Sequence, residues 1–178
     1  MDNDNRVLIE VSPTDIFIHE AAIPAYEFDL DLTRQCAVRP QYESITALHQ
    51  FEFPIVLKPK EGEFFSVIAG WSPLLATSTE NRESLTVISI PDMPRAEIED
   101  FAWHYVIAHM MRQVDHPTFY AQLYMCLQRC SLSHSSIETL TGIHGKTLAA
   151  IARRLSCTSI STAKRQIKRL QFGWGELT

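Results

Sequence analysis

The stretch TLAAIARRLSCTSISTAKRQIKRL, residues 147–170, decides how the C-terminal part of this chain folds. Its apolar residues recur with helical spacing on both sides of a short polar segment. Residues 146–155 are predicted to form one helix and residues 160–171 another, joined by a turn at 156–159. The small Ala152 would let the two helices approach closely, as in a helix-turn-helix. The side chains expected at their interface are Leu148, Ile151, Leu155, Ile160, Ala163, Ile167 and Leu170.

A second helix-turn-helix frame overlaps the first. It reads HSSIETLTGIHGKTLAAIARRL, residues 134–155, and Gly142 permits a left-handed turn between its two helices. Both frames use the helix at 146–155, so together they predict a three-helix bundle. Glu138 stands where the 134–155 frame usually has alanine. We therefore take residues 160–171 as the recognition helix, which would enter a major groove.

The charge of the chain is divided unevenly along its length. The whole sequence carries a net charge of −5 at pH 7. Residues 128–178 hold eight of the 16 Lys and Arg residues but only two of the 21 Asp and Glu residues. The last part is therefore basic and suited to a phosphate backbone, whereas residues 1–127 are acidic and would repel one. A basic helix that is merely solvated, with no partner, is the alternative interpretation.

Candidate DNA contacts follow from the recognition helix and the basic residues near it. Ser161 and Thr162 lie at the start of that helix, where hydroxyls and backbone amides suit a phosphate. Ser161, Thr162 and Arg165 are the best candidates for contacts to base edges. The full predicted set is Lys146, Arg153, Arg154, Ser161, Thr162, Lys164, Arg165, Lys168 and Arg169.

Double-stranded DNA is the partner expected for this surface. We expect a homodimer, because a single module of this size rarely binds tightly alone. A helical subdomain that only packs, or that binds an acidic protein partner, is the alternative to DNA binding.

The first half of the chain predicts a small sheet. Apolar and β-branched runs bounded by turn residues indicate strands at 7–11, 16–18, 53–57, 64–69 and 85–90. A polar turn at 58–63 makes a hairpin of residues 53–69. A short helix is predicted at 42–49, and a further short helix is predicted to begin within 74–77. Residues 21–38 have no clean period and are predicted to be a loop.

From Glu97 onward the apolar period changes to about 3.6 residues, which indicates helices. The first, 97–115, is expected to face inward with Ile98, Phe101, Ala102, Tyr105, Val106 and His109. The second, 117–130, is expected to face inward with Phe119, Leu123 and either Cys126 or Leu127. The proline-containing segment 91–96 is the best boundary. The prediction is an α+β chain, with a sheet domain at 1–95 and an all-helical region at 96–178.

The order of motifs in the first half resembles a known family. Residues 38–77 read VRPQYESITALHQFEFPIVLKPKEGEFFSVIAGWSPLLAT, which is similar to the N-terminal domain of ParB-type proteins, a fold shared with sulfiredoxin. The matching features are Arg39 in a loop, the 42–49 helix, Pro-Ile-Val at 54–56, the 58–63 turn and Val-Ile-Ala-Gly at 67–70. The resemblance covers residues 7–92. It implies a small mixed-sheet domain followed by a helix-rich DNA-binding part.

The diagnostic positions of that family differ in this chain. After the glycine that corresponds to Gly70, ParB proteins have Glu-Arg-Arg and sulfiredoxin has Cys-His-Arg, and the arginines hold nucleotide phosphates. Here the positions are Trp71, Ser72 and Pro73, which supply neither a cation nor a thiol. The resemblance leaves Arg39, Gly70 and Ser72 as the remnant of a nucleotide site. The chain is therefore expected to bind DNA rather than to act as an enzyme.

The resemblance and the basic tail together imply a cytoplasmic, ParB-like DNA-binding protein. Its expected role is partition or transcriptional regulation of a plasmid or another mobile element. The alternatives are a nucleotide hydrolase or nuclease of the same fold, dependent on Glu20, Asp29 or Arg39, and a fertility-inhibition effector of a conjugative plasmid. Such an effector would bind a protein partner through the acidic half.

Neither a catalytic residue nor a resident metal or cofactor is assigned from the sequence. The acidic residues Glu20, Glu27, Asp29 and Asp31 could hold Mg²⁺ in a nuclease, but a solvated or partner-facing acidic loop is the favoured interpretation. The apolar runs are too short for a membrane-spanning helix.

Overall fold

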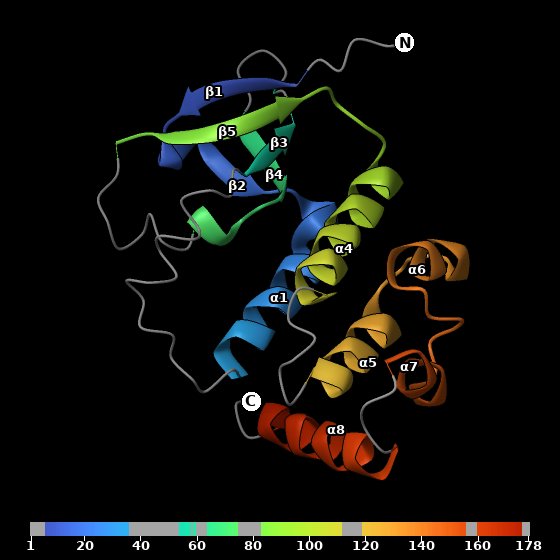
Figure 1. The fold of residues 1–178 in the computed structure, drawn as a ribbon. Helices are drawn as coiled ribbons and strands as arrows, with labels where there is room; N and C mark the ends of the chain where they lie inside the picture. The colour runs from blue at the N-terminus through green and yellow to red at the C-terminus, as the bar shows by residue number, and fades with distance from the viewer. Residues whose placement is uncertain are drawn as a thin grey trace. The chain divides into compact units, whose positions relative to one another are not determined.

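The chain folds into a five-stranded mixed sheet and a set of helices, which confirms the α+β class (Figure 1). The computed structural model describes residues 6–35, 54–57, 59, 64–74, 83–111, 119–155 and 160–175, without the side chains of 33–35, 153, 155, 163 and 169–175.

Two compact units make up the chain. The sheet unit comprises Met1–Leu30 and Cys36–Ala102, and the helical unit comprises Asp31–Gln35 and Trp103–Thr178. The division thus falls after Ala102, within a helix, whereas the sequence predicts a boundary at 91–96.

The sheet contains all five predicted strands. Its order is β1 (Val7–Val11), β5 (Leu85–Ile90), β3 (Ile55–Leu57), β4 (Phe65–Ala69) and β2 (Ile16–Ile18). The β1–β5 and β3–β4 pairs are antiparallel, and the β5–β3 and β4–β2 pairs are parallel. The predicted hairpin is therefore present as β3 and β4. Parallel pairing of β2 with β4 requires a long crossover between them, and helix α1 begins that crossover.

Helix α1 (Ile23–Gln35) corrects the prediction of a loop at 21–38. The buried positions of this segment are Ala21, Ala22, Ala25, Phe28, Asp29 and Leu32, which recur three or four residues apart. Asp29 interrupts the apolar pattern of this stripe, and because an aspartate is rarely buried, the sequence does not show a helical period here. The predicted helix at 42–49 and most of the turn at 58–63 lie outside the described residues. A helix does begin after Gly70, at residues 72–74, slightly earlier than predicted.

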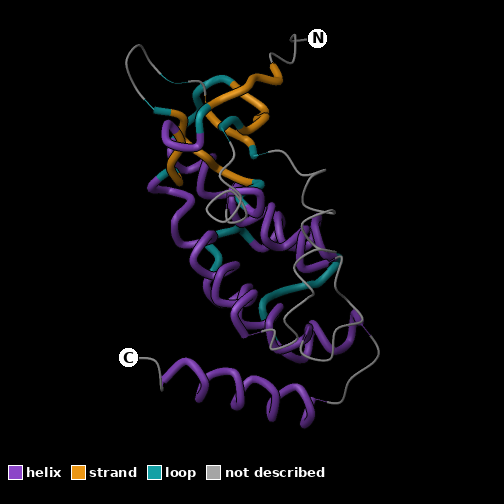
Figure 2. Tube along the Cα trace, turned by 90° about the vertical axis from the view of Figure 1, so that its left-hand side faces the viewer, coloured by secondary structure: helices purple, strands orange, loops and turns teal. Residues whose placement is uncertain are grey.

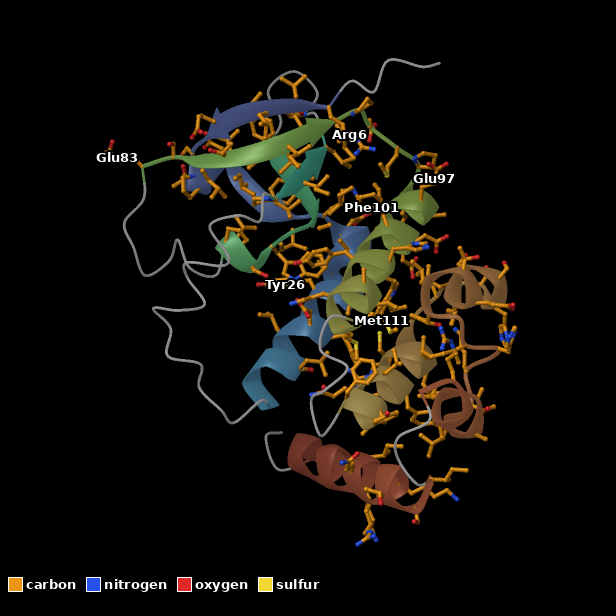
Figure 3. The ribbon with its side chains drawn as sticks, viewed as in Figure 1. Arg6, Tyr26, Glu83, Glu97, Phe101 and Met111 are labelled. Carbon is orange, nitrogen blue, oxygen red and sulfur yellow. The ribbon has the colours of Figure 1, made fainter. Side chains whose placement is uncertain are left out.

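The buried aspartate has a specific partner in the sheet unit. The indole Nε1 of Trp71 donates a hydrogen bond to Oδ2 of Asp29 over 2.8 Å, and both residues are buried. Tyr26, labelled on α1 in Figure 3, meets the Trp71 ring edge-on with 5.5 Å between the ring centroids. A buried carboxylate needs such a donor, since burial without one is costly. The pair therefore links α1 to the segment that follows β4.

Replacing Asp29 by alanine should lower the free energy of unfolding by about 1–3 kcal/mol, because the buried indole N–H loses this acceptor. Glu27→Ala is the matched control, since Glu27 lies on the same helix and is exposed. Urea denaturation of both variants measures the difference. Equal stability of the two variants would show that the indole–carboxylate bond does not hold α1 in place.

The five remaining labelled helices lie where helices are predicted. They are α4 (Arg95–Met111), α5 (Phe119–Arg129), α6 (His134–Thr141), α7 (Leu148–Leu155) and α8 (Ile160–Gly175). Residues 112–118, which contain the predicted end of the 97–115 helix and the predicted start of the 117–130 helix, lie outside the described residues. Helix α8 extends four residues beyond the predicted end at 171. Figure 2 shows it as one continuous helix close to the C-terminus.

The buried face of α4 lies beside the predicted one. Its buried side chains are Ile98, Ala102, Trp103, Val106, Ile107 and Met110. Of the predicted face, Ile98, Ala102 and Val106 are buried, but Phe101 is exposed and Tyr105 and His109 are half-buried. Two apolar stripes lie next to each other on this helix, so the period alone does not decide which is buried.

Candidate nucleic-acid interface

Helix α5 forms the core of the helical unit. Its buried side chains are Phe119, Tyr120, Ala121, Gln122, Leu123, Met125, Cys126 and Leu127. The predicted inward residues Phe119, Leu123, Cys126 and Leu127 are all among them. A helix that is buried on nearly all sides must be surrounded by other elements.

Helices α5, α7 and α8 contact one another in pairs. The sequence predicts a bundle of α6, α7 and α8, and these contacts show that α5 also packs against α7 and α8. The sequence pattern does not place α5 in this bundle. The turn between α7 and α8, at 156–159, lies outside the described residues.

Helix α6 has the start and end that its sequence predicts. Ser133 caps its N-terminus by accepting a hydrogen bond from the backbone N–H of Ser136 over 3.1 Å. Gly142 ends the helix with φ of 67°, and its N–H bonds to the carbonyl of Glu138. The left-handed turn at Gly142 is therefore confirmed. Ile137 and Ile143, on either side of it, are fully buried.

Helix α8 carries its described cations on the solvent side. Lys164, Arg165 and Lys168 are exposed, and Ile167 is buried. At about 100° per residue, the three cations lie within about 100° of one another around the helix axis. The side chain of Arg169 lies outside the described residues. Helix α8 therefore has a basic flank, which we define as Lys164, Arg165 and Lys168.

The N-terminal end of α8 differs from the prediction at one position. Ser161 is exposed and Thr162 is half-buried. Ile160, predicted to pack inward against α7, is 43% exposed. It is the first residue of the helix and lies seven residues before the buried Ile167. The helix end therefore presents an apolar side chain beside hydroxyls.

Lys146 has a structural partner inside the helical unit. Its Nζ donates to the carbonyl oxygen of Cys130 over 2.9 Å, and its own carbonyl accepts from Nε2 of Gln128 over 2.6 Å. These two bonds join the end of α5 to the segment before α7. Lys146 is half-buried, so its ammonium is less available to a phosphate than those of the basic flank.

Cys130 lies beneath the Lys146 ammonium. Burial raises the pKa of the Cys130 thiol, and the charge of Lys146 partly offsets that effect. The thiol donates to the carbonyl of Leu127 over 3.6 Å. A buried thiol with a raised pKa is unreactive. Cys126 and Cys130 are both buried free thiols, and Cys130 packs inside the helical unit.

Arg154 lies close to the end of α6. A Cβ atom at Gly142 would stand 2.7 Å from Nε of Arg154, so the guanidinium passes directly over this glycine. Arg154 itself is exposed. A cation near the C-terminus of a helix interacts favourably with the carbonyls there. Among the other predicted contacts, the side chain of Arg153 lies outside the described residues.

Two of the residues predicted as the remnant of a nucleotide site, Gly70 and Ser72, lie on either side of a buried aromatic residue in the sequence. Gly70 has a positive φ of 68° and Ser72 is half-buried, but Trp71 between them is fully buried against Asp29. Arg39 lies outside the described residues. The position that carries a charged or reactive residue in the resembling families is therefore occupied here by part of the core.

The candidate Mg²⁺ ligands are not gathered into a site. Glu20 forms an ion pair with Arg95, and Asp29 accepts from Trp71. Within the described parts of the chain, no group of three or more His, Cys, Asp or Glu side chains could hold a metal ion.

No protein-family model matches the chain, and a search of curated proteins gives no match. The similarity to ParB-type proteins therefore stays an expectation from the order of motifs. Among the described helices, none is both long and apolar enough to cross a membrane.

Replacing Lys146 by methionine should lower the free energy of unfolding by about 1 kcal/mol, because the Cys130 carbonyl loses its donor. This corresponds to a fall in Tm of about 2–4 °C. Lys164→Met is the matched control, since Lys164 is exposed, and it should leave Tm unchanged. Thermal unfolding followed by circular dichroism distinguishes them. An unchanged Tm in Lys146→Met would contradict a structural role for this lysine.

Replacing Gly142 by alanine should lower stability by about 1–2 kcal/mol, because alanine is strained at this left-handed φ. The nearby Arg154 side chain is flexible and can move aside, so strain should dominate. The double variant with Arg154→Ala tests this, and the two effects should add to within about 0.5 kcal/mol. A large rescue by Arg154→Ala would instead make the close approach of the guanidinium the main cost.

Proposed function

We propose that this protein binds double-stranded DNA through α8, which enters the major groove as a recognition helix. The observation that carries the proposal is the basic flank of α8, with three exposed cations and the buried Ile167 turned toward the other helices. Helix packing thus leaves a charged surface that one groove of a duplex can accommodate.

The predicted contacts divide into two kinds. Lys164, Lys168 and Arg169 would pair with phosphates and supply affinity that depends on salt but not on sequence. Ser161, Thr162 and Arg165 would lie near base edges, where arginine recognises guanine by paired hydrogen bonds. Lys146 and Arg154 would contribute less to binding, because their side chains lie against backbone of the helical unit.

The resemblance of the first half to ParB-type proteins extends the proposal to the whole chain. A ParB-like protein of a plasmid or other mobile element would bind its site as a homodimer, with two copies of α8 in successive major grooves. The acidic sheet unit would then serve assembly or hold a protein partner rather than hydrolyse a nucleotide. Trp71 favours this role, because it is buried at the position where ParB-type proteins have residues that hold nucleotide phosphates.

Binding to a 30-base-pair duplex should fall steeply as salt rises, and the variant with Lys164, Arg165, Lys168 and Arg169 all changed to alanine should flatten that dependence. Each phosphate that the variant no longer neutralises reduces the slope of log K against log salt concentration by about 0.9. Fluorescence anisotropy over a series of KCl concentrations measures the slope. The control is Arg95→Ala, which removes positive charge from the sheet unit. Equal slopes in the two variants would contradict recognition by α8.

A further inference from the structure

Strand β1 forms one edge of the sheet. It stands at the end of the strand order, and among the described strands it pairs only with β5 (Figure 1). That pairing is regular along the whole strand, and its sequence, VLIEV, contains no proline. Val7 and Leu8 are 54% and 61% exposed, although neighbouring side chains of a strand point to opposite faces of the sheet. The outer side of β1 therefore presents backbone N–H and C=O groups in the form that another strand can pair with.

The charged residues of this edge stand symmetrically about Leu8. Arg6 comes two residues before Leu8 and Glu10 two residues after it. Arg6, labelled in Figure 3, and Glu10 are both exposed. Side chains alternate along a strand, so Leu8 and Glu10 share a face, and a strand continued by one residue brings Arg6 to the same face. A cation and an anion at equal distances from one residue are the pattern that an antiparallel copy of the same strand complements.

Antiparallel pairing of two β1 strands about a two-fold axis at Leu8 gives this match in full. Leu8 then faces Leu8 of the second copy, and Val7 faces Ile9. On each side of the axis Arg6 faces Glu10, and opposite charges directly across two strands are stabilising. The pairing adds about four to six backbone hydrogen bonds, depending on which residues of β1 turn their N–H groups outward.

Both charged groups have capacity for this interaction. Arg6 already interacts within its own chain, but a guanidinium has five N–H donors. The carboxylate of Glu10 accepts a hydrogen bond from Oγ1 of Thr86 and has further lone pairs. Hydrogen bonds from Thr86 and Ser84 lower the pKa of Glu10, so this group is charged at neutral pH.

We propose that two copies of this protein join through antiparallel pairing of their β1 strands, with Leu8 at the two-fold axis. The symmetric charges select the partner, because a second copy always carries the complementary pattern, whereas a foreign strand would have to reproduce it. The proposal names the interface of the homodimer that the proposed DNA binding requires, and to that extent it rests on the proposed function. Dimerisation is measured without DNA, so the two proposals can fail separately.

Reversing one charge at a time should weaken the dimer. In Arg6→Glu both cross-strand pairs become pairs of carboxylates, and in Glu10→Arg both become pairs of guanidinium groups. Each variant should raise the dissociation constant of the dimer about tenfold, since two pairs change from attraction to repulsion together. Sedimentation equilibrium of the full-length chain measures this constant, in about 0.05 M salt, where exposed charges are weakly screened. Circular dichroism checks that each variant is folded.

Exchange of the charges separates pairing from an effect on folding. Arg6→Glu and Glu10→Arg together in one chain should restore the wild-type constant. A mixture of the two single variants should form a heterodimer tighter than either homodimer, because each pair then joins opposite charges. Glu97→Arg is the matched control, since Glu97 is an exposed glutamate of the sheet unit outside β1, and it should leave the constant unchanged.

A wild-type protein that stays monomeric overturns the proposal. A dimer that both single variants leave unchanged overturns it too, as does a mixture that forms no heterodimer. If the charge exchange behaves as expected but no DNA is bound, the β1 interface stands and the proposed function fails alone.

Discussion

The burial of α5 is the constraint on which the helical unit depends. Eight of its eleven residues are buried, so its neighbours must cover it on nearly every side. Helices α7 and α8 contact it and each other, and each has only one apolar face to offer. Because Ile167 faces this core, the cations at Lys164, Arg165 and Lys168 are left in solvent. The proposed binding surface is thus a consequence of packing and requires no separate element.

The sheet unit depends on a different interaction. The hydrogen bond from Trp71 to Asp29 joins the turn after β4 to helix α1, which the sequence pattern does not predict. In the resembling families this turn carries the residues that hold nucleotide phosphates. In this chain the indole of Trp71 is buried at this position and donates to the carboxyl group of Asp29. The same short segment can therefore serve ligand binding or core packing, according to one or two side chains.

The basic residues of the helical unit are not equivalent, although the sequence presents them as one group. Lys146 donates to the Cys130 carbonyl and Arg154 passes over Gly142, so both are placed by the protein's own backbone. The described cations of α8 are exposed, whereas Ile167 is buried. Net charge attracts a duplex at long range, but only residues with mobile, solvated ends can adjust to its phosphates. Lys146 and Arg154 therefore belong mainly to the packing of the helical unit, whereas the basic flank makes up the proposed DNA-binding surface.

The sequence by itself determined the α+β class, the five strands, the helices from α4 to α8 and the left-handed turn at Gly142. These follow from local period and turn chemistry, which are properties of neighbouring residues. Tertiary structure alone decided that residues 23–35 form a helix, because Asp29 becomes acceptable inside only when Trp71 supplies a donor. It also decided that α5 completes the bundle with α7 and α8 and that Ile160 is exposed. Those outcomes depend on which surfaces meet, and a local pattern carries no information about a partner that is distant in the sequence.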